Sequence, residues 1–280
     1  YAFGGRPSYP ISTQEFKNLM LLRRTWAGKM VALKIGLRMI REKLTGARLV
    51  GAGAALQGRM LELALKADIP IHLDTRVTEL VCEDDTVTGV VALRDGKEVA
   101  IEARLGVLID AGGFSRNQKM RDSYHAAPSS AKWTIVNQGD HGDMHEAAAR
   151  VGAVLAAMHE AWWAPGSFLP DGSFGGIHSP MDIGKPHAIV VNNEGRRIGN
   201  EASAYVEFGR RMYQSHTVPA WAIMDSRHRA KYFWGVTAPG AIPKGWVENG
   251  YAKVADTLDE LARKCGIDAQ QLKQTVEAFN

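Results

Sequence analysis

The chain has 280 residues, of which 45% are hydrophobic and 23% are charged, and its formal net charge at pH 7 is +4. This balance is typical of a globular chain with two domains, and it argues against nucleic-acid binding because the basic residues are not gathered with stacking aromatics. Cys82 and Cys265 lie far apart and form no C-x-x-C pair, so the sequence indicates neither a disulfide framework nor a thiolate metal site. A reducing cytoplasm is the expected compartment.

The first predicted element is an amphipathic helix surrounded by basic residues. Its apolar positions follow a 3,4,3,4 spacing: Met30, Leu33, Leu37, Ile40 and Leu44. Such a stripe most often faces a protein core, and peripheral contact with a membrane is the alternative. Charges interrupt every window near the ~20 apolar residues that a membrane span requires.

An alternating helix and strand pattern follows. A helix is predicted over residues 54–67 and a strand over residues 69–73. Three further apolar segments predict antiparallel strands: residues 77–82, 87–93 and 99–103. The dipeptide Asp95-Gly96 is a strong hairpin signal between the last two. The sequence therefore predicts a small antiparallel sheet beside an α/β layer.

A buried apolar strand over residues 106–110 is expected to return to the parallel layer. Gly112 and Gly113 follow it directly and let the backbone approach a ligand closely, because they carry no Cβ atom. Ser115 is the expected cap of a short helix that ends near residue 124, and another helix is predicted over residues 145–151.

The chain is expected to cross into a second domain near residue 159, within an aromatic segment broken by prolines. Residues 188–191 and the turn at 192–195 favour a short hairpin, after which a helix contains Tyr205. Two terminal helices are predicted on either side of Cys265-Gly266. Their expected first-turn capping pairs are Thr257 with Glu260, and Asp268 with Gln271.

Three motifs occur in a fixed order along the chain. They are the strand and glycine junction from Gly106 to Asn117, the loop GDHGDM at 139–144, and the sequence GRRIGNEASAY at 195–205. Together they resemble the flavoenzyme superfamily that joins fumarate reductases to FAD-dependent 3-ketosteroid dehydrogenases. In the fumarate-reductase-like branch, the position of Tyr205 is an arginine that delivers a proton to a dicarboxylate. The ketosteroid branch carries tyrosine there, so the closest resemblance is to the 3-ketosteroid Δ1-dehydrogenases.

The resemblance implies an α/β and α+β fold. A partial Rossmann-like FAD-binding domain with a small antiparallel sheet is expected over residues 1–158, followed by an α+β catalytic domain over residues 159–280. The pyrophosphate-binding G-x-G-x-x-G turn is absent, since Gly51-Ala-Gly53 lacks the third glycine. The chain is therefore expected to be an internal portion of a longer enzyme, and to bind FAD weakly or not at all by itself.

The resemblance also implies the site residues. Backbone or side-chain contacts with FAD are expected from Gly51, Ala52, Val77, Ala111, Gly112, Gly113, Asn117, Asp140, Asn200 and Glu201. An apolar substrate, a steroid in the first interpretation, is expected against Trp162, Trp163, Phe168 and Phe174. Tyr205 is the expected catalytic residue, because a phenol can exchange a proton with carbon next to a ketone. An external electron acceptor is expected to reoxidise the cofactor.

Each of these assignments has a structural alternative. Tyr205 can be a buried helical tyrosine with a paired hydroxyl, and Asn200-Glu201 can be a simple helix cap. The aromatic residues can pack the domain junction instead of a substrate. A phenolate at Tyr205 needs a nearby donor or cation, for which the candidates are Arg196, Arg197 and Arg210.

Two other functions remain open from the sequence. One is reduction of an unsaturated carboxylic acid by a fumarate-reductase-like enzyme, which requires an arginine near Tyr205; the other is a non-catalytic binding module. His141 and His145 lack the H-E-x-x-H order, so no metal site is expected. There is no G-x-S-x-G elbow, and the scattered serines define no triad, so no serine nucleophile is expected.

Overall fold

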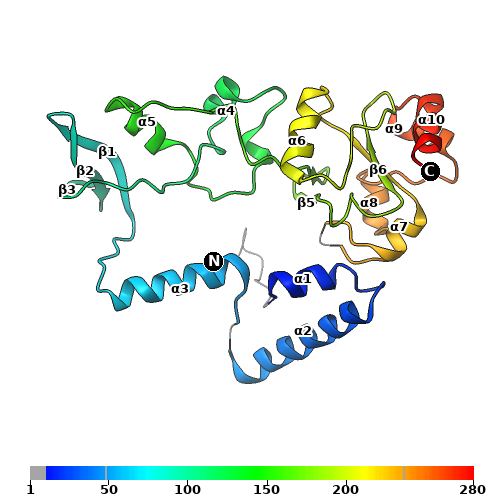
Figure 1. Cartoon of the computed structure of the whole chain (residues 1–280), viewed down its shortest axis with the longest axis horizontal. Helices are drawn as coiled ribbons and strands as arrows, with labels where there is room; N and C mark the ends of the chain where they lie inside the picture. Colours follow the sequence, from blue (N-terminus) through cyan, green and yellow to red (C-terminus); the bar gives the residue numbers. More distant parts are fainter. Residues whose placement is uncertain (1–10, 48, 236) are drawn as a thin grey trace. The chain divides into compact units, whose positions relative to one another are not determined.

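The computed structural model describes residues 11–47, 49–235 and 237–280. These residues form two compact units, and Figure 1 labels their helices and strands where there is room. The first unit comprises residues 53–161, and the second unit comprises residues 11–52 and 162–280. Among the residues in these described ranges, no helix is both long enough and apolar enough to cross a membrane.

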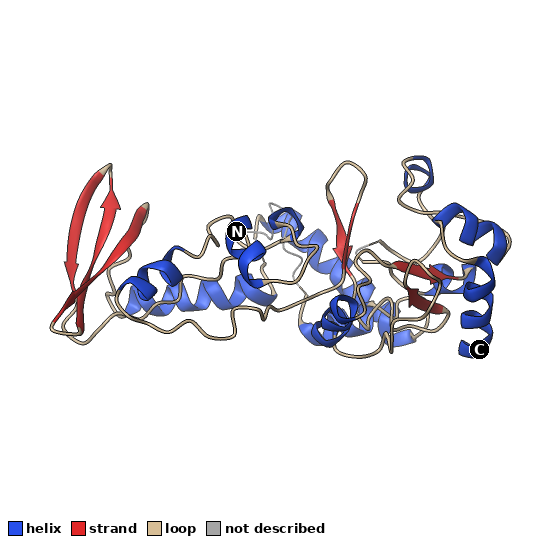
Figure 2. Ribbon diagram, turned by 90° about the horizontal axis from the view of Figure 1, so that it is seen from above, coloured by secondary structure: helices blue, strands red, loops and turns tan. Residues whose placement is uncertain are grey.

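The sheet of the first unit has the predicted antiparallel strands. Its order is β1 (Thr75–Glu83), β2 (Thr86–Arg94) and β3 (Lys97–Glu102), and Figure 2 shows them as a small separate sheet. Asp95 and Gly96 connect β2 to β3 with φ angles of 50° and 75°. Positive φ at both residues is what a two-residue hairpin turn requires, so the turn prediction is confirmed.

Among the described residues, the helices that belong to the first unit or lead into it are α3 (Ala52–Lys66), α4 (Gln118–Tyr124), the 3-10 helix η2 (Ala131–Trp133) and α5 (Asp143–Arg150). The predicted cap of α4 was wrong by two residues. Asn117, not Ser115, accepts a hydrogen bond from the Met120 backbone N–H at 3.1 Å. Gly142 is the N-cap of α5 and has a φ of 82°. An added Cβ there would lie 2.6 Å from the Met120 sulfur, so both the backbone conformation and the space favour glycine.

The two predicted strands of a parallel layer, residues 69–73 and 106–110, are not strands in this structure. All strand pairs among the described residues are antiparallel. A buried parallel strand needs hydrogen-bonded neighbours and cover on both faces, and these segments have neither here. Leu73 and Leu108 are consequently exposed.

The second unit begins with α1 (Thr13–Leu19) and α2 (Trp26–Thr45). The helix at α2 was predicted, but its buried face was not. Gly28, Val31 and Ile35 are its buried residues, and a Cβ at Gly28 would lie 2.8 Å from backbone atoms at the end of α1. The predicted core-facing stripe is instead exposed, and Leu44 is 82% accessible. The close approach of the two helices at Gly28 therefore decides which face is covered.

The rest of the second unit is built around two short sheets. In chain order its elements are β4 (Gly166–Phe168), β5 (Phe174–Ile177), β6 (Ala188–Val191), α6 (Tyr205–Gln214), β7 (Trp221–Met224), α7 (Ser226–Lys231), α8 (Lys244–Glu248), α9 (Leu258–Cys265) and α10 (Ala269–Phe279). β4 pairs with β5, and β6 pairs with β7, both antiparallel. The hairpin predicted after β6 is reduced to a single bridge between Val191 and Arg197.

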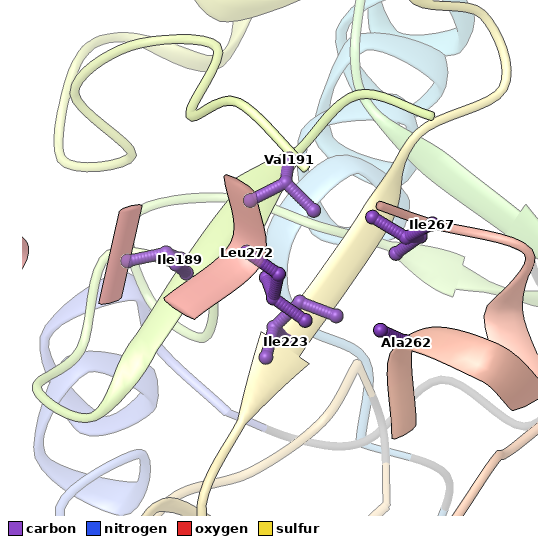
Figure 3. Close-up of a cluster of buried hydrophobic side chains, with 6 residues drawn as sticks. All are labelled: Ile189, Val191, Ile223, Ala262, Ile267 and Leu272. Carbon is purple, nitrogen blue, oxygen red and sulfur yellow. The ribbon is translucent and has the colours of Figure 1, made fainter. Parts of the chain in front are cut away.

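The core of the second unit lies on both faces of β6. Ile189 and Val191 pack with Ile223 against α9 and α10, where Leu272 is fully buried (Figure 3). Val190 points to the opposite face and packs with Phe208 of α6 in a second cluster. This alternation is the period of two that a strand buried on both faces produces.

The ends of the two terminal helices agree with the sequence analysis. Thr257 accepts a hydrogen bond from the Glu260 backbone N–H, and Asp268 accepts one from the Gln271 backbone N–H. Gly266 ends α9 in the left-handed conformation with a φ of 69°. These helices hold β6 and β7 in place, and the same sheet leads into the GRRIGNEASAY motif.

Candidate active site

Tyr205 is the first residue of α6, and its side chain is half-buried. Its hydroxyl oxygen accepts a hydrogen bond from the indole Nε1 of Trp162 at 2.9 Å. Trp162 itself is 80% exposed. An N–H group directed at a phenol oxygen stabilises negative charge on that oxygen. The structure thus joins the expected catalytic residue to one of the expected substrate-pocket residues.

Glu201 has a different environment from Asn200. The Glu201 carboxylate is 3% exposed, accepts a hydrogen bond from the Val190 backbone N–H at 2.8 Å, and pairs with the guanidinium of Arg197. This pairing raises the pKa of Arg197 above its usual value. Asn200 is exposed and accepts a hydrogen bond from the Ala202 backbone N–H at 3.0 Å. Both residues therefore shape the turn that enters α6, and their contact with FAD stays a prediction.

The remaining expected pocket aromatics lie in two other contacts. Trp163 packs its ring against Tyr213 of α6 at a centroid distance of 4.9 Å, and Phe168 packs edge-on against Phe174 across the β4–β5 hairpin at 5.6 Å. None of the expected pocket residues lines the cavity of about 1200 Å³ that the structure shows in the second unit. Their role with a substrate stays a prediction.

The three arginines proposed to assist Tyr205 all have carboxylate neighbours. Arg196 lies 3.3 Å from Glu194, and Arg210 lies 3.8 Å from Glu207. Arg197 is held by the buried Glu201, as described above. The donor that the structure brings to the Tyr205 oxygen is instead an indole, which the arginine hypothesis missed. The pair Trp162 and Tyr205 is separated by 43 positions, so no local pattern identifies it.

In the first unit, the glycine junction and the GDHGDM loop lie against each other. The Arg116 backbone N–H donates to the Asp140 carbonyl at 2.9 Å, and the Asn117 side-chain amide donates to the His141 carbonyl at 2.9 Å. A Cβ at Gly112, whose φ is 75°, would lie only 2.5 Å from the Asp140 carboxylate. Glycine at 112 is therefore required for this approach.

A cavity of about 330 Å³ opens beside this junction. Val77, Ala111 and Gly139 line it, together with the ion pair of Arg76 and Asp143, whose charged atoms are 2.6 Å apart. A Cβ at Gly113 would meet no protein atom within 4 Å, so backbone there is open to a ligand. The exposed backbone and the guanidinium can donate hydrogen bonds, and the carboxylates can accept them, which together fits part of a nucleotide cofactor. Arg76 and Asp143 were not predicted, and they are 67 positions apart.

Gly51 and Ala52 lie at the start of α3. The Ala52 side chain lies outside what the structure describes, and no described contact joins Gly51 to the other expected FAD residues. His145 packs edge-on against Phe114 at a ring-centroid distance of 5.9 Å. Among the described residues there is no cluster of three or more His, Cys, Asp or Glu side chains suited to a metal.

The glycine junction and the GDHGDM loop therefore form a candidate site in the first unit, and the GRRIGNEASAY motif forms another in the second unit. Comparison with known protein families shows that the model of the FAD binding domain matches residues 23–280, which is nearly the whole chain. The chain belongs to the FAD binding domain family. Membership confirms the expected fold class and indicates FAD as the cofactor.

Two similar proteins from the comparisons are 3-ketosteroid dehydrogenases by name. The 3-oxosteroid 1-dehydrogenase of Mycobacterium tuberculosis is 35% identical over an alignment covering 100% of this chain and 52% of that protein. The crystal structure of 3-ketosteroid delta1-dehydrogenase from Sterolibacterium denitrificans, in complex with 1,4-androstadiene-3,17-dione, matches with a TM-score of 0.81 and 33% identity. That match covers 95% of this chain and 50% of the solved chain.

A third relative is named for a different oxo compound. The 4-oxocyclohex-2-ene-1-carboxylate 5-dehydrogenase of Sinomonas cyclohexanicum is 35% identical over 81% of this chain and 40% of that protein. Matched proteins named as acrylate or fumarate oxidoreductases are less similar, at 26% and 28% identity. The chain spans about half the length of the first curated relatives that it matches.

Proposed function

We propose that the full-length parent of this chain is an FAD-dependent dehydrogenase that introduces a C=C bond next to the ketone of a 3-ketosteroid or a similar cyclic ketone. The similarity to 3-oxosteroid 1-dehydrogenases supports the reaction class. The single observation that carries the proposal is the tyrosine at position 205, with an indole N–H donated to its oxygen. This arrangement is suited to a proton acceptor, and it lacks the fork-shaped guanidinium that a dicarboxylate prefers.

The proposed reaction removes two hydrogens from adjacent carbons. The ketone acidifies the proton on C2, and the Tyr205 oxygen takes that proton as the C2–H bond breaks. Bound FAD would supply the acceptor for the hydrogen on C1 and its electron pair, which would leave a double bond between C1 and C2. The Trp162 indole N–H donates to the Tyr205 oxygen and orients it for the transfer, and the exposed Trp162 ring offers an apolar surface to the substrate.

The test is a Tyr205→Phe variant of the full-length parent, because the substitution removes the hydroxyl and keeps the ring. We expect FAD binding to remain and turnover of a ketosteroid to fall by about 100-fold or more. Tyr213→Phe is the matched control, since Tyr213 lies on the same helix and packs against Trp163. Turnover of the Tyr205→Phe parent close to that of the control would remove the assigned role.

The carboxylate-reducing alternative has less support. Arg196, Arg197 and Arg210 are each beside a carboxylate, and the contact that the structure gives to the Tyr205 oxygen comes from an indole. Assays of the parent with fumarate and with a ketosteroid distinguish the two functions. Reoxidation of the reduced cofactor requires an external electron acceptor, which we propose as a second substrate.

We also propose that α2 attaches the protein peripherally to an anionic membrane surface, without crossing the membrane. Leu33, Leu37 and Ile40 are each more than half exposed, and basic residues flank this stripe. An apolar stripe with basic flanks suits the boundary between anionic headgroups and acyl chains. We expect the parent to sediment with phosphatidylglycerol vesicles and the Leu37→Asp/Ile40→Asp variant to stay in the supernatant. Equal sedimentation of both would contradict the proposal.

A further inference from the structure

Four side chains of the second unit form a hydrogen-bonded chain outside the three flavoprotein motifs. The Asp182 carboxylate lies 2.7 Å from Nδ1 of His178, and Nε2 of His178 lies 2.8 Å from the Ser167 hydroxyl oxygen. The Ser167 oxygen lies a further 2.7 Å from the Tyr251 hydroxyl oxygen. The expectation that the serines define no triad was therefore wrong in geometry. Ser167 and His178 are 11 positions apart, and His178 and Asp182 are 4 positions apart. No elbow motif surrounds the serine.

The Asp182 carboxylate sets the direction of every hydrogen bond in this chain. Burial acts to raise the pKa of Asp182, but the hydrogen bond from His178 and backbone N–H groups outweigh it and hold the pKa below its usual value. A charged Asp182 requires a proton on Nδ1 of His178, which leaves Nε2 as the acceptor for the Ser167 hydroxyl. Tyr251 must then donate its hydroxyl proton to the Ser167 oxygen, while accepting from Trp234 Nε1 at 2.9 Å.

The imidazole is held rigidly in the orientation that this transfer requires. His178 and Asp182 are almost completely buried, and the Trp234 ring stacks on the imidazole at a centroid distance of 4.0 Å. Backbone N–H groups also donate to the Asp182 carboxylate, among them that of Gly235 at 3.0 Å. A side chain at Gly175 would lie 2.8 Å from the Ser167 hydroxyl oxygen, so glycine there leaves room for the network.

Ser167 is half-buried, and it lies at the wall of a cavity. Together with His178, Trp234 and Tyr251 it lines a cavity of about 1200 Å³ in the second unit. The β4–β5 pairing shifts register between Ser167 and Phe168, an irregularity of the kind that redirects a side chain at the edge of a site. Further apolar side chains line the same cavity: Ile183, Val190, Phe208 and Trp246. The hydroxyl therefore opens onto an apolar pocket.

We propose that Ser167 is the nucleophile of a second catalytic site in this protein, one that cleaves carboxylic esters with an apolar acyl group. The Ser167 oxygen forms a bond to the ester carbonyl carbon, and its proton passes to Nε2 of His178. Tyr251 is placed to donate to the carbonyl oxygen as that oxygen becomes negative. The ester C–O bond then breaks, and His178 returns the proton to the alcohol that leaves. Water hydrolyses the acyl-serine by the same steps, so the net reaction is ester and water to acid and alcohol.

The test is covalent labelling of the full chain with an alkyl fluorophosphonate, which needs no FAD and is independent of the dehydrogenase assignment. The expected result is a phosphonyl adduct on Ser167 with release of fluoride, found by mass spectrometry of the digested protein. Hydrolysis of p-nitrophenyl butyrate by the same protein should also depend on Ser167. We expect Ser167→Ala to abolish both, and His178→Ala to slow both by at least about 100-fold.

Two further variants keep the test decisive if His178→Ala does not fold. Ser173→Ala removes an exposed hydroxyl from the turn of the same hairpin and should leave labelling unchanged. Tyr251→Phe keeps the ring and should slow labelling by about 10-fold through loss of one hydroxyl donor. No adduct on Ser167 in the folded chain, or equal labelling of Ser167 and Ser173, would overturn the proposal.

Discussion

Replacing Glu201 by Gln tests the interaction that anchors the GRRIGNEASAY motif. The chain offers a matched control, because the same motif contains two arginine and glutamate pairs. Glu201 is 3% exposed and pairs with Arg197, whereas the pair of Glu194 and Arg196 is exposed on both sides. Glu201→Gln and Glu194→Gln make the same chemical change in these two environments.

The expected cost follows from the contacts that Gln cannot keep. The Glu201 carboxylate accepts hydrogen bonds from the Val190 N–H and from two nitrogens of Arg197. Gln retains one acceptor oxygen and turns an NH₂ group toward a guanidinium that has no proton acceptor to offer. Breaking a buried pair costs about 3–5 kcal/mol, but the Arg197 side chain is 34% exposed and is partly solvated, which reduces the expected loss to about 2–3 kcal/mol. Glu194→Gln should cost about 0.5 kcal/mol or less.

The assay is urea unfolding followed by tryptophan fluorescence. Of the seven tryptophans, only Trp133 lies in residues 53–161, so the signal reports chiefly on the second unit. A double-mutant cycle with Arg197→Met isolates the pairwise energy, since the two sites are in direct contact. If Glu201→Gln costs no more than Glu194→Gln, the argument from burial fails.

The remaining predictions concern the cofactor loop and the first two helices. Gly112→Ala should lower stability by about 1–3 kcal/mol because of its positive φ and the Asp140 contact, whereas Gly113→Ala should keep stability and weaken FAD binding by the parent about 10-fold. Unchanged FAD affinity in Gly113→Ala, measured by flavin fluorescence, would show that backbone does not contact FAD there. Glu15 has its pKa lowered from 4.5 to about 2, chiefly by the hydrogen bond from Arg38. The stability that Glu15 contributes is present above pH 4.5 and should be lost as the pH falls toward 2, which is measured as helix content against pH. An Arg38→Met variant that loses helix over the same pH range would show that the pair of Glu15 and Arg38 is not the cause.

Local sequence signals determined much of this protein. Asp95-Gly96 specified a hairpin turn because few other residue pairs adopt positive φ twice in succession. Thr257 and Asp268 specified where two helices begin, because each side chain reaches a backbone N–H three residues later. The apolar run at residues 188–191 specified the strand β6, although not that both of its faces would be buried. The ordered motifs also identified the family, with tyrosine at position 205, without any knowledge of distances.

Only the tertiary structure decided what each of these elements meets. Residues 69–73 are apolar enough for a buried strand, but a strand exists only where a neighbouring strand pairs with its N–H and C=O groups, and no strand among the described residues pairs with this segment. The buried face of α2 was set by close approach to α1 at Gly28, not by its strongest apolar stripe. Similarly, the indole of Trp162 reached Tyr205, and Tyr251 reached Ser167, across 43 and 84 positions. Hydrogen bonds act over about 3 Å in space. Partners that are far apart in the sequence therefore become visible only in the folded structure, which brings them together.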